Sequence, residues 1–429
     1  MAVLVTGATG FIGSALIGRL REAGHDVIAV VRQVDDDARR LPARLVPLDI
    51  AGATRPEDWL PHLDGVEAVI NCAGVLQDSL RDSTHGVHVA GVAALYEACE
   101  HLNVRRVIHL SAIGADREAL SDFSRTKRQG EDILTGRELD WVILRPSVVV
   151  GRAAYGGSAL FRGLAALPIL PAFPDTGPLQ IVQLDDVIAS IVFFLKPGAP
   201  ARLTVDVAGP HRLAMTEVIA AYRRWLGWRP ARVVNVPRAL ASLLYRAGDA
   251  VAWLGWRPPV RSTARREMVR GAVGDPGQWS ILTGIKPRSL ADALAAEPAS
   301  VQERWFAPLY LIKPFVFVVF PLFWIITGIV SLGPGFEIGK NLMLEGGAGP
   351  LSGPAVVAGA FADIAIGVAI VFRRTSRLGL HAALAISIFY FIAGSILVPR
   401  LWAEPLGPLL KIWPILGLNL AMLAILRER

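Results

Sequence analysis

Four apolar stretches toward the C-terminal end constrain the fold of this chain more than any other feature. Each holds about 20 residues of low charge, which as a helix is long enough to cross a hydrocarbon core of about 30 Å. The stretches cover residues 309–332, 350–372, 378–399 and 405–426. Overall 53% of the chain is hydrophobic and 19% charged, and most of the apolar surplus lies in these stretches. The sequence therefore predicts an all-α, four-helix transmembrane domain over residues 305–429.

The distribution of arginine predicts how these helices are oriented. The turn at residues 373–377 carries three arginines, and the chain ends with two more at residues 427–429. The loops on the opposite side mix Lys340 and Arg400 with glutamates. Because positively charged loops stay on the cytoplasmic side, we expect a multi-pass protein of a bacterial inner membrane with both termini in the cytoplasm.

The N-terminal residues fit a strand, a glycine-rich turn and a helix. An apolar strand leads into the turn at residues 6–13, and a helix follows over residues 14–23. Gly7 permits the tight turn, Gly10 lets the backbone approach a pyrophosphate, and Gly13 lets the helix pack on the strand. The helix N-terminus attracts the phosphates. The residues expected at a dinucleotide are Gly7, Thr9, Gly10, Phe11 and Ile12.

Arg32 follows the second predicted strand, residues 26–31, at the position that distinguishes the two nicotinamide dinucleotides. An acidic residue there would accept hydrogen bonds from the ribose 2′-hydroxyl of NAD(H), whereas a cation suits a 2′-phosphate. We therefore expect NADP(H) as the cofactor, in preference to NAD(H).

Motifs along residues 1–210 resemble those of the extended and atypical short-chain dehydrogenase/reductase superfamily. These motifs are Leu48-Asp49-Ile50, Asn71-Cys72-Ala73-Gly74, His109-Leu110-Ser111 and Leu144-Arg145-Pro146-Ser147. Strand-like segments alternate with helical ones along the same region, which predicts an α/β fold with a doubly wound parallel Rossmann sheet.

The resemblance implies a role for one or two residues of each motif. Asp49 and Ile50 would lie at the adenine, and Ala73 and Gly74 under the cofactor. Pro146 would lie beside the nicotinamide. Ser111 would occupy the position of the catalytic serine.

Phe123 replaces the tyrosine of the Tyr-x-x-x-Lys pair that this superfamily uses as its proton donor. Phenylalanine cannot carry a proton, so the standard reaction is excluded. Lys127 and Ser111 remain as candidate catalytic residues, and Lys127 would also bind the nicotinamide ribose. Tyr155 is an alternative donor by position alone.

Two precedents in the superfamily keep two functions open. Some atypical reductases work with the lysine as the polar group, which predicts an oxidoreductase acting on a quinone- or isoprenoid-like lipophilic substrate. Other members only bind the nucleotide. The motifs resemble those of the accessory NAD(P)-binding subunit of respiratory complex I, which predicts a structural or sensor subunit of a membrane redox complex.

Residues 211–300 are expected to form a smaller substrate-side lobe and linker. In the segment before it, Asp185 or Asp186 is expected to cap a helix. The lobe is rich in tryptophan and arginine, which suits an apolar surface near lipid headgroups. The net charge of +7 is scattered, so no nucleic-acid partner is expected. The histidines show no metal-ligand spacing, and no metal is expected.

Residues 305–426 resemble a DoxX-like membrane domain, a family associated with quinone-linked redox systems. Ala355, Gly359, Asp363 and Gly367 recur every four residues and predict a close-packing helix face. Asp363 is expected to point at a neighbouring helix, with Lys411 or a hydrogen-bond acceptor as its partner. The expected partners of the whole protein are membrane lipid and a lipophilic substrate or membrane redox protein.

Overall fold

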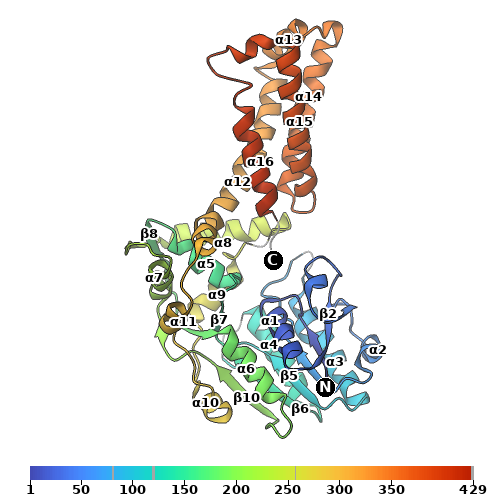
Figure 1. The fold of residues 1–429 in the computed structure, drawn as a ribbon, viewed down its shortest axis with the longest axis vertical. Helices are drawn as coiled ribbons and strands as arrows, with labels where there is room; N and C mark the ends of the chain where they lie inside the picture. The colour runs from blue at the N-terminus through green and yellow to red at the C-terminus, as the bar shows by residue number, and fades with distance from the viewer. Residues whose placement is uncertain (80–81, 118–120, 257, 427–429) are drawn as a thin grey trace. The chain divides into compact units, whose positions relative to one another are not determined.

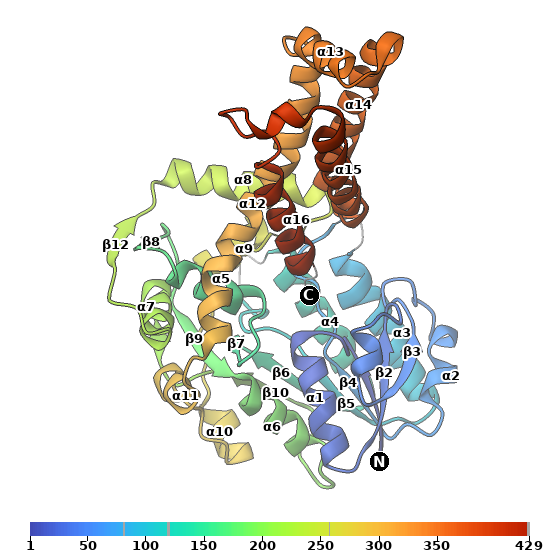
Figure 2. The same cartoon turned by 45° about the horizontal axis from the view of Figure 1, so that its top comes forward.

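The computed structural model describes residues 1–79, 82–117, 121–256 and 258–426 (Figures 1 and 2). The arginines expected at residues 427–429 lie outside the described residues. The chain divides into two compact units. The first comprises Met1–Asp249 and Pro258–Ala307, and the second Ala250–Arg257 and Pro308–Arg429. Most of the predicted lobe, residues 211–249 and 258–300, therefore shares a compact unit with residues 1–210, whereas residues 250–257 belong to the second unit.

A parallel sheet of seven strands organises the first unit, in the order β10-β6-β5-β4-β1-β2-β3 (Figure 1). Every pairing in it is parallel, as expected for strands joined by helical crossovers. The strands are β1 (Ala2–Thr6), β2 (Asp26–Val31), β3 (Arg44–Pro47), β4 (Ala68–Asn71), β5 (Arg106–Leu110), β6 (Asp140–Pro146) and β10 (Leu203–Val207). The chain reverses its direction of winding between β1 and β4, which defines a doubly wound fold.

Helices cover both faces of the sheet, because the strands are apolar on both sides. One core contains Leu16 of α1 (Phe11–Glu22) and Val187 of α6 (Leu184–Phe194), and Trp279 closes it at the β10 edge. The other core contains Leu63 of α2 (Leu60–Leu63), together with residues of α3 (Gly91–His101) and α4 (Asp122–Thr135). The predicted Rossmann fold is confirmed.

Smaller elements build a lobe with its own apolar core beside this sheet. It contains a three-stranded sheet, β11-β9-β7, and a two-stranded sheet, β12-β8. Its strands are β7 (Val148–Val150), β8 (Ile169–Ala172), β9 (Leu179–Gln183), β11 (Arg212–Leu213) and β12 (Arg232–Asn235). The helices of this part of the chain are α5 (Gly156–Ala165), α7 (Met215–Trp225), α8 (Arg238–Trp253), α9 (Ser262–Arg270), α10 (Gly277–Thr283) and α11 (Leu290–Ala296).

The expected helix cap at Asp185 or Asp186 is wrong. Gln183 is the N-cap residue of α6, and both aspartates lie in its first turn. They face Arg288 instead: Arg288 donates to Asp185 at 3.2 Å, and its backbone N–H donates to Asp186 at 3.3 Å. Both carboxylates therefore have a structural role, as expected, but they attach a later segment of the chain to α6.

The second unit consists mainly of apolar helices. Among the described residues, three are long and apolar enough to span a membrane. They are α12 (Val301–Leu332), α14 (Ser352–Val371) and α15 (Ser376–Leu397), and the shorter helices are α13 (Phe336–Glu345) and α16 (Ile412–Ile425). The fourth predicted span, 405–426, is α-helical only from Ile412, because Pro405, Gly407 and Pro408 form turns before it. Its 14 residues rise about 21 Å.

Small residues let the membrane helices approach closely. A Cβ atom on Gly367 would lie 2.7 Å from the carbonyl oxygen of Pro321 on α12, and one on Gly328 would lie 2.5 Å from that of Ala360. Asp363 is buried on α14 and accepts a hydrogen bond of 3.3 Å from the Tyr390 hydroxyl on α15. Asp363 thus faces a neighbouring helix, as predicted, and Lys411 is the exposed N-cap residue of α16.

Candidate functional site

The turn between β1 and α1 can exist only with glycine at two positions. Gly7 has φ +63°, and a Cβ on it would lie 2.7 Å from the backbone of Cys72 and Ala73. A Cβ on Gly13 would lie 2.3 Å from the Gly7 carbonyl oxygen. These approaches bring the start of α1 close to the carboxyl end of β1. The turn therefore has the geometry that a pyrophosphate requires.

The start of α1 also suits an anion electrostatically. Gly10 is its N-cap residue, and the first turn of this fully described helix contains no acidic side chain. The unpaired N–H groups there favour a phosphate. Thr9 lies in the turn, and Phe11 and Ile12 form the first residues of α1, all three partly exposed.

Buried hydrogen bonds fix the loop after β4 beneath this turn. Asn71 Oδ1 accepts from the Thr6 hydroxyl at 2.6 Å and from the Ala73 N–H at 3.1 Å. Its amide donates to the Tyr96 hydroxyl at 3.1 Å and to Nδ1 of His109 at 3.0 Å. Burial lowers the pKa of His109, so the imidazole is neutral and its Nδ1 can accept. Ala73, predicted to contact the cofactor, is held in place by this network, and Gly74, predicted to do the same, follows it directly.

Lys127 is buried on α4 against two backbone carbonyls. Its ammonium donates to Leu110 at 2.8 Å and to Ala73 at 3.0 Å, so one of its three hydrogens stays available. Burial lowers the pKa of Lys127 to about 8, while the Glu131 carboxylate acts in the opposite direction. Lys127 is therefore bonded to the residue directly before Ser111, which brings the two predicted catalytic residues together at the end of β5.

The hydroxyls of Ser111 and Ser147 are unpartnered at neighbouring strand ends. Ser111 follows β5 and Ser147 follows β6, and neither buried oxygen has a hydrogen-bond partner among the described residues. Buried hydroxyls of this kind are expected to find a partner. A carboxamide or a carbonyl oxygen bound at these strand ends would provide one. Pro146, predicted to lie beside the nicotinamide, is buried directly before Ser147.

His88 is a site residue that the sequence analysis missed. Its Nε2 accepts from the Val75 N–H at 2.9 Å, so the proton lies on Nδ1, which donates to the Thr126 hydroxyl at 2.8 Å. Burial and then the Lys127 charge lower the pKa of His88 to about 2. The ring contacts Phe123 edge-on at 5.7 Å. His88 therefore positions the loop after β4 and cannot replace the missing tyrosine as an acid.

A buried ion pair anchors the helix that carries Lys127. Arg145 donates to both oxygens of Glu131 at 2.9 and 2.6 Å, and to Asp116 at 2.6 Å. Glu131 lies one turn after Lys127, on the same face of α4. The pair therefore fixes α4 to β6 and sets the position of the lysine.

Arg32 forms ion pairs with Asp49 at 3.5 Å and Asp82 at 3.0 Å. A 2′-phosphate at Arg32 would therefore compete with two carboxylates. Asp49 also accepts from the Ala51 N–H at 3.3 Å, at the end of the Leu48-Asp49-Ile50 motif. The backbone of Ile50 packs tightly on α3. A Cβ atom on Gly91 of α3 would lie 2.2 Å from the carbonyl oxygen of Ile50.

Tyr155 lies at the glycine-rich turn. Its ring stacks on Phe11 with centroids 5.4 Å apart and an interplanar angle of 4°. Lys127, by contrast, is bonded to the loops after β4 and β5. These contacts give no support to Tyr155 as the replacement proton donor.

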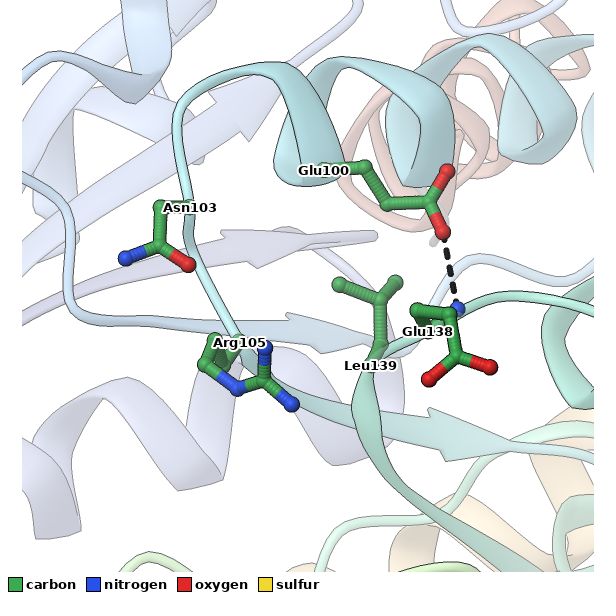
Figure 3. A pocket seen from close by; sticks show the side chains of 5 residues that line it. All are labelled: Glu100, Asn103, Arg105, Glu138 and Leu139. Carbon is green, nitrogen blue, oxygen red and sulfur yellow. Dashed lines mark hydrogen bonds between the residues drawn. The ribbon is translucent and has the colours of Figure 1, made fainter.

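A surface pocket of about 210 Å³ has none of these residues in its lining; Figure 3 shows the side chains that line it. It is lined by Glu100, Asn103, Arg105, Glu138 and Leu139, which precede β5 and β6 or end α3. In the figure Glu100 accepts a hydrogen bond from the backbone of Glu138, at 2.8 Å. Ligands of doubly wound sheets bind at the carboxyl ends of the strands. This pocket lies at the amino ends and is not the cofactor site.

Comparison with family models agrees with both parts of the fold. A model described as NAD(P)H-binding matches residues 7–161, and one described as a DoxX-like family matches residues 321–420. Among the described residues, no cluster of histidine, cysteine and acidic side chains could hold a metal ion.

Curated relatives resemble more than half of the chain. The sterol demethylase protein B of Methylococcus capsulatus is 30% identical over 329 residues, which cover 71% of this chain and 99% of that protein. The ceramide reductase of Caulobacter vibrioides is 28% identical over 55% of this chain and 73% of its own length. A mitochondrial NADH dehydrogenase (ubiquinone) 1 alpha subcomplex subunit 9 from Arabidopsis thaliana is 29% identical, and the alignment spans only 62% of it.

A solved structure shows the same fold. The UDP-glucuronic acid 4-epimerase of Bacillus cereus, in complex with UDP-glucuronic acid and NAD, matches with a TM-score of 0.52 at 20% identity. The match covers 72% of this chain and all of the epimerase chain. The chain belongs to the NAD(P)-binding short-chain dehydrogenase/reductase family, and it carries a DoxX-like membrane domain. It is a membrane protein whose cofactor is a nicotinamide nucleotide.

Proposed function

We propose that the protein is a membrane-anchored reductase that uses NADP(H) to reduce a carbonyl group of a lipophilic, quinone- or isoprenoid-like substrate. The observation that carries this proposal is Lys127, a buried ammonium with a lowered pKa and one hydrogen available beside Ser111. Two relatives named for lipid substrates, a ceramide reductase and a sterol demethylase protein, support the lipophilic class.

The residues of this site can complete a reduction without tyrosine. A reduced nicotinamide bound at these strand ends would supply the hydride for the new C–H bond at the carbonyl carbon. The Lys127 ammonium donates a proton to the carbonyl oxygen, and the neutral amine regains it from water. The hydroxyls of Ser111 and Ser147 hold the oxygen by hydrogen bonds while its charge develops.

Phe123 supports a second function, which is binding of the nucleotide without turnover. Its ring lies against neutral His88, so this part of α4 carries no proton donor. In that case the protein is a structural or sensor subunit of a membrane redox complex. The similarity to a complex I subunit from Arabidopsis thaliana favours the same interpretation.

Turnover of NADPH by the full chain in detergent distinguishes the two functions. We expect NADPH absorbance to fall with at least one member of a panel of lipophilic ketones, aldehydes and quinones. Lys127→Ala should abolish this turnover, and Ser111→Ala should reduce it. Lys286→Ala, which removes an exposed lysine of the same unit, is the matched control and should leave it unchanged. NADPH that binds but is never oxidised, with Lys127→Ala weakening only binding, supports the non-catalytic function.

We further propose that the nucleotide-binding unit and both termini lie in the cytoplasm of a bacterium, with the helices in the inner membrane. The three arginines at residues 373–377 support this orientation, since Arg373 and Arg374 lie in the turn between α14 and α15 and Arg377 lies in the first turn of α15. Cytoplasmic NADPH would then be directly accessible to the glycine-rich turn.

A further inference from the structure

Helix α8 exposes leucines that a helix on the surface of a soluble lobe would normally bury. Its inward face consists of small residues and one aromatic ring: Ala241, Tyr245, Gly248 and Ala252 are buried. Its outward face carries Leu240, Leu243 and Leu244, and Leu243 is 63% exposed. A soluble helix normally buries its leucines and exposes its polar residues.

Contacts on the inward face show that this orientation is built into the fold. The Tyr245 ring lies 6.4 Å from the ring of Phe173, which follows β8. A Cβ on Gly248 would lie 1.8 Å from the carbonyl oxygen of Val260, so only glycine permits this approach. The helix cannot rotate to bury its leucines without losing both contacts.

Neighbouring strands extend the apolar surface. β12 leads into α8 and is exposed throughout, and it pairs with β8, where Ile169 is exposed. In this register Val234 lies on the same side as Ile169, and Val233 lies on the opposite side. We call the exposed apolar residues Ile169, Val234, Leu240, Leu243 and Leu244 the α8 patch. Exposed apolar residues gathered in this way mark an interaction site.

The exposed charged residues of α8 indicate what kind of partner the α8 patch binds. The exposed charged residues of the helix are Arg246 and Arg238, and Arg238 forms an ion pair with Asp175 at 2.8 Å. The acidic residue of the helix, Asp249, is half-buried against Ser262 and Arg261. A helix with leucines on its outward face and arginines beside them is the pattern of an interfacial membrane helix. Arginines at such a surface are attracted to anionic lipid headgroups.

The last turn of α8 and the residues after it belong to the second compact unit, which also contains the membrane helices. Leu254, just after it, accepts a backbone hydrogen bond of 3.0 Å from Arg373, and Trp256 Nε1 donates to Val371, the last residue of α14, at 2.8 Å. The Arg373 guanidinium lies 5.5 Å from the Trp256 ring. The chain that leaves α8 is therefore held at the arginine-rich end of α14.

We propose that the α8 patch docks on the bilayer, with the leucines of α8 inserted among the headgroups of anionic lipids on the side of the α14–α15 turn. The proposal concerns lipid contact alone and holds whether or not the protein oxidises NADPH.

The test uses a fluorophore on single cysteines in the full chain, reconstituted in vesicles of phosphatidylglycerol and phosphatidylcholine. Leu243→Cys reports on the α8 patch. Ile281→Cys, on α10, is the matched control because Ile281 is 84% exposed and α10 packs at the β10 edge of the large sheet. Burial raises the pKa of Cys72 and Cys99 to about 12, so both react slowly, and labelled wild type gives the background.

Nitroxide-bearing lipids should quench the label at residue 243 several-fold more than the label at residue 281, and aqueous iodide should give the reverse order. Adding Arg246→Glu should weaken the lipid quenching in anionic vesicles. Equal access of iodide to both labels overturns the proposal. Protection of residue 243 from both quenchers also overturns it, since a protein or a second copy of the chain would then cover the patch. Leu240→Cys repeats the measurement should the first variant fold poorly.

Discussion

Lys127 combines two demands that usually conflict in a protein interior. The ammonium is buried, which disfavours its charge, yet two carbonyl oxygens satisfy two of its hydrogens. The result is a pKa of about 8, so the side chain is mostly protonated at neutral pH but releases its proton more easily than an exposed lysine. These are the properties required of a proton donor that works without tyrosine.

The pH profile of turnover tests this role. Only the protonated lysine donates, so kcat should be flat on the acidic side of the Lys127 pKa. Above about pH 8 it should fall about tenfold per pH unit as the ammonium is lost. The measurement is NADPH oxidation at saturating substrate. In Lys127→Arg the cation persists but does not release its proton, so turnover should be lost at every pH although the positive charge is kept. A wild-type profile that stays flat to about pH 10 contradicts a donor role for Lys127.

Arg32 should determine the choice of nucleotide. Hydrogen bonds to a charged group contribute about 1.5–3 kcal/mol, so Arg32→Asp should weaken NADPH binding by about 10- to 100-fold and leave NADH binding similar or stronger. Titrations of cofactor fluorescence measure both affinities. Asp82→Asn is the complementary variant: it removes a carboxylate 3.0 Å from Arg32 and should strengthen NADPH binding. An unchanged ratio in Arg32→Asp would show that Arg32 does not contact the 2′-phosphate.

At the scale of elements, α1 offers a clean comparison between two glycines. Gly13→Ala would place a Cβ 2.3 Å from the Gly7 carbonyl oxygen, so α1 must move away from the turn and nucleotide binding should be lost. Gly18→Ala, on the same helix, meets nothing within 4 Å and should stabilise the protein by about 0.5–1 kcal/mol. Thermal unfolding and cofactor titration of both variants check this. Wild-type affinity in Gly13→Ala contradicts the role given to the turn.

The strands, the glycine-rich turn and the membrane helices could be predicted from sequence because each depends on local pattern. The predicted strand at residues 26–31 matches β2. Only part of the candidate site could be predicted from local sequence pattern. Lys127 had a family motif, but His88 acts through Val75 and Thr126, and nothing in the neighbouring sequence indicates contacts across 13 and 38 residues. The fourth span was predicted too long because hydropathy does not register the turns at residues 405–408.

For the whole molecule, a lipophilic substrate and a water-soluble nucleotide impose different requirements. The nucleotide must reach the glycine-rich turn from an aqueous compartment, while the substrate is concentrated in lipid. A chain that joins a Rossmann domain to membrane helices satisfies both only if the Rossmann domain lies on the side that holds NADPH. The orientation of the helices is therefore as important to the proposed function as Lys127.

Single cysteines in the two opposite sets of loops test this orientation in intact bacterial cells. The turn between α14 and α15 carries Arg374, and α13, at the other end of α14, carries Lys340. We expect a membrane-impermeant maleimide to label Lys340→Cys in intact cells with a permeable outer membrane. Arg374→Cys should be labelled only after the inner membrane is opened. Both substitutions remove one positive charge, so they are matched, and wild type controls for Cys72 and Cys99. The reverse pattern would place the glycine-rich turn outside the cytoplasm, away from NADPH, and the proposed reduction could not occur there.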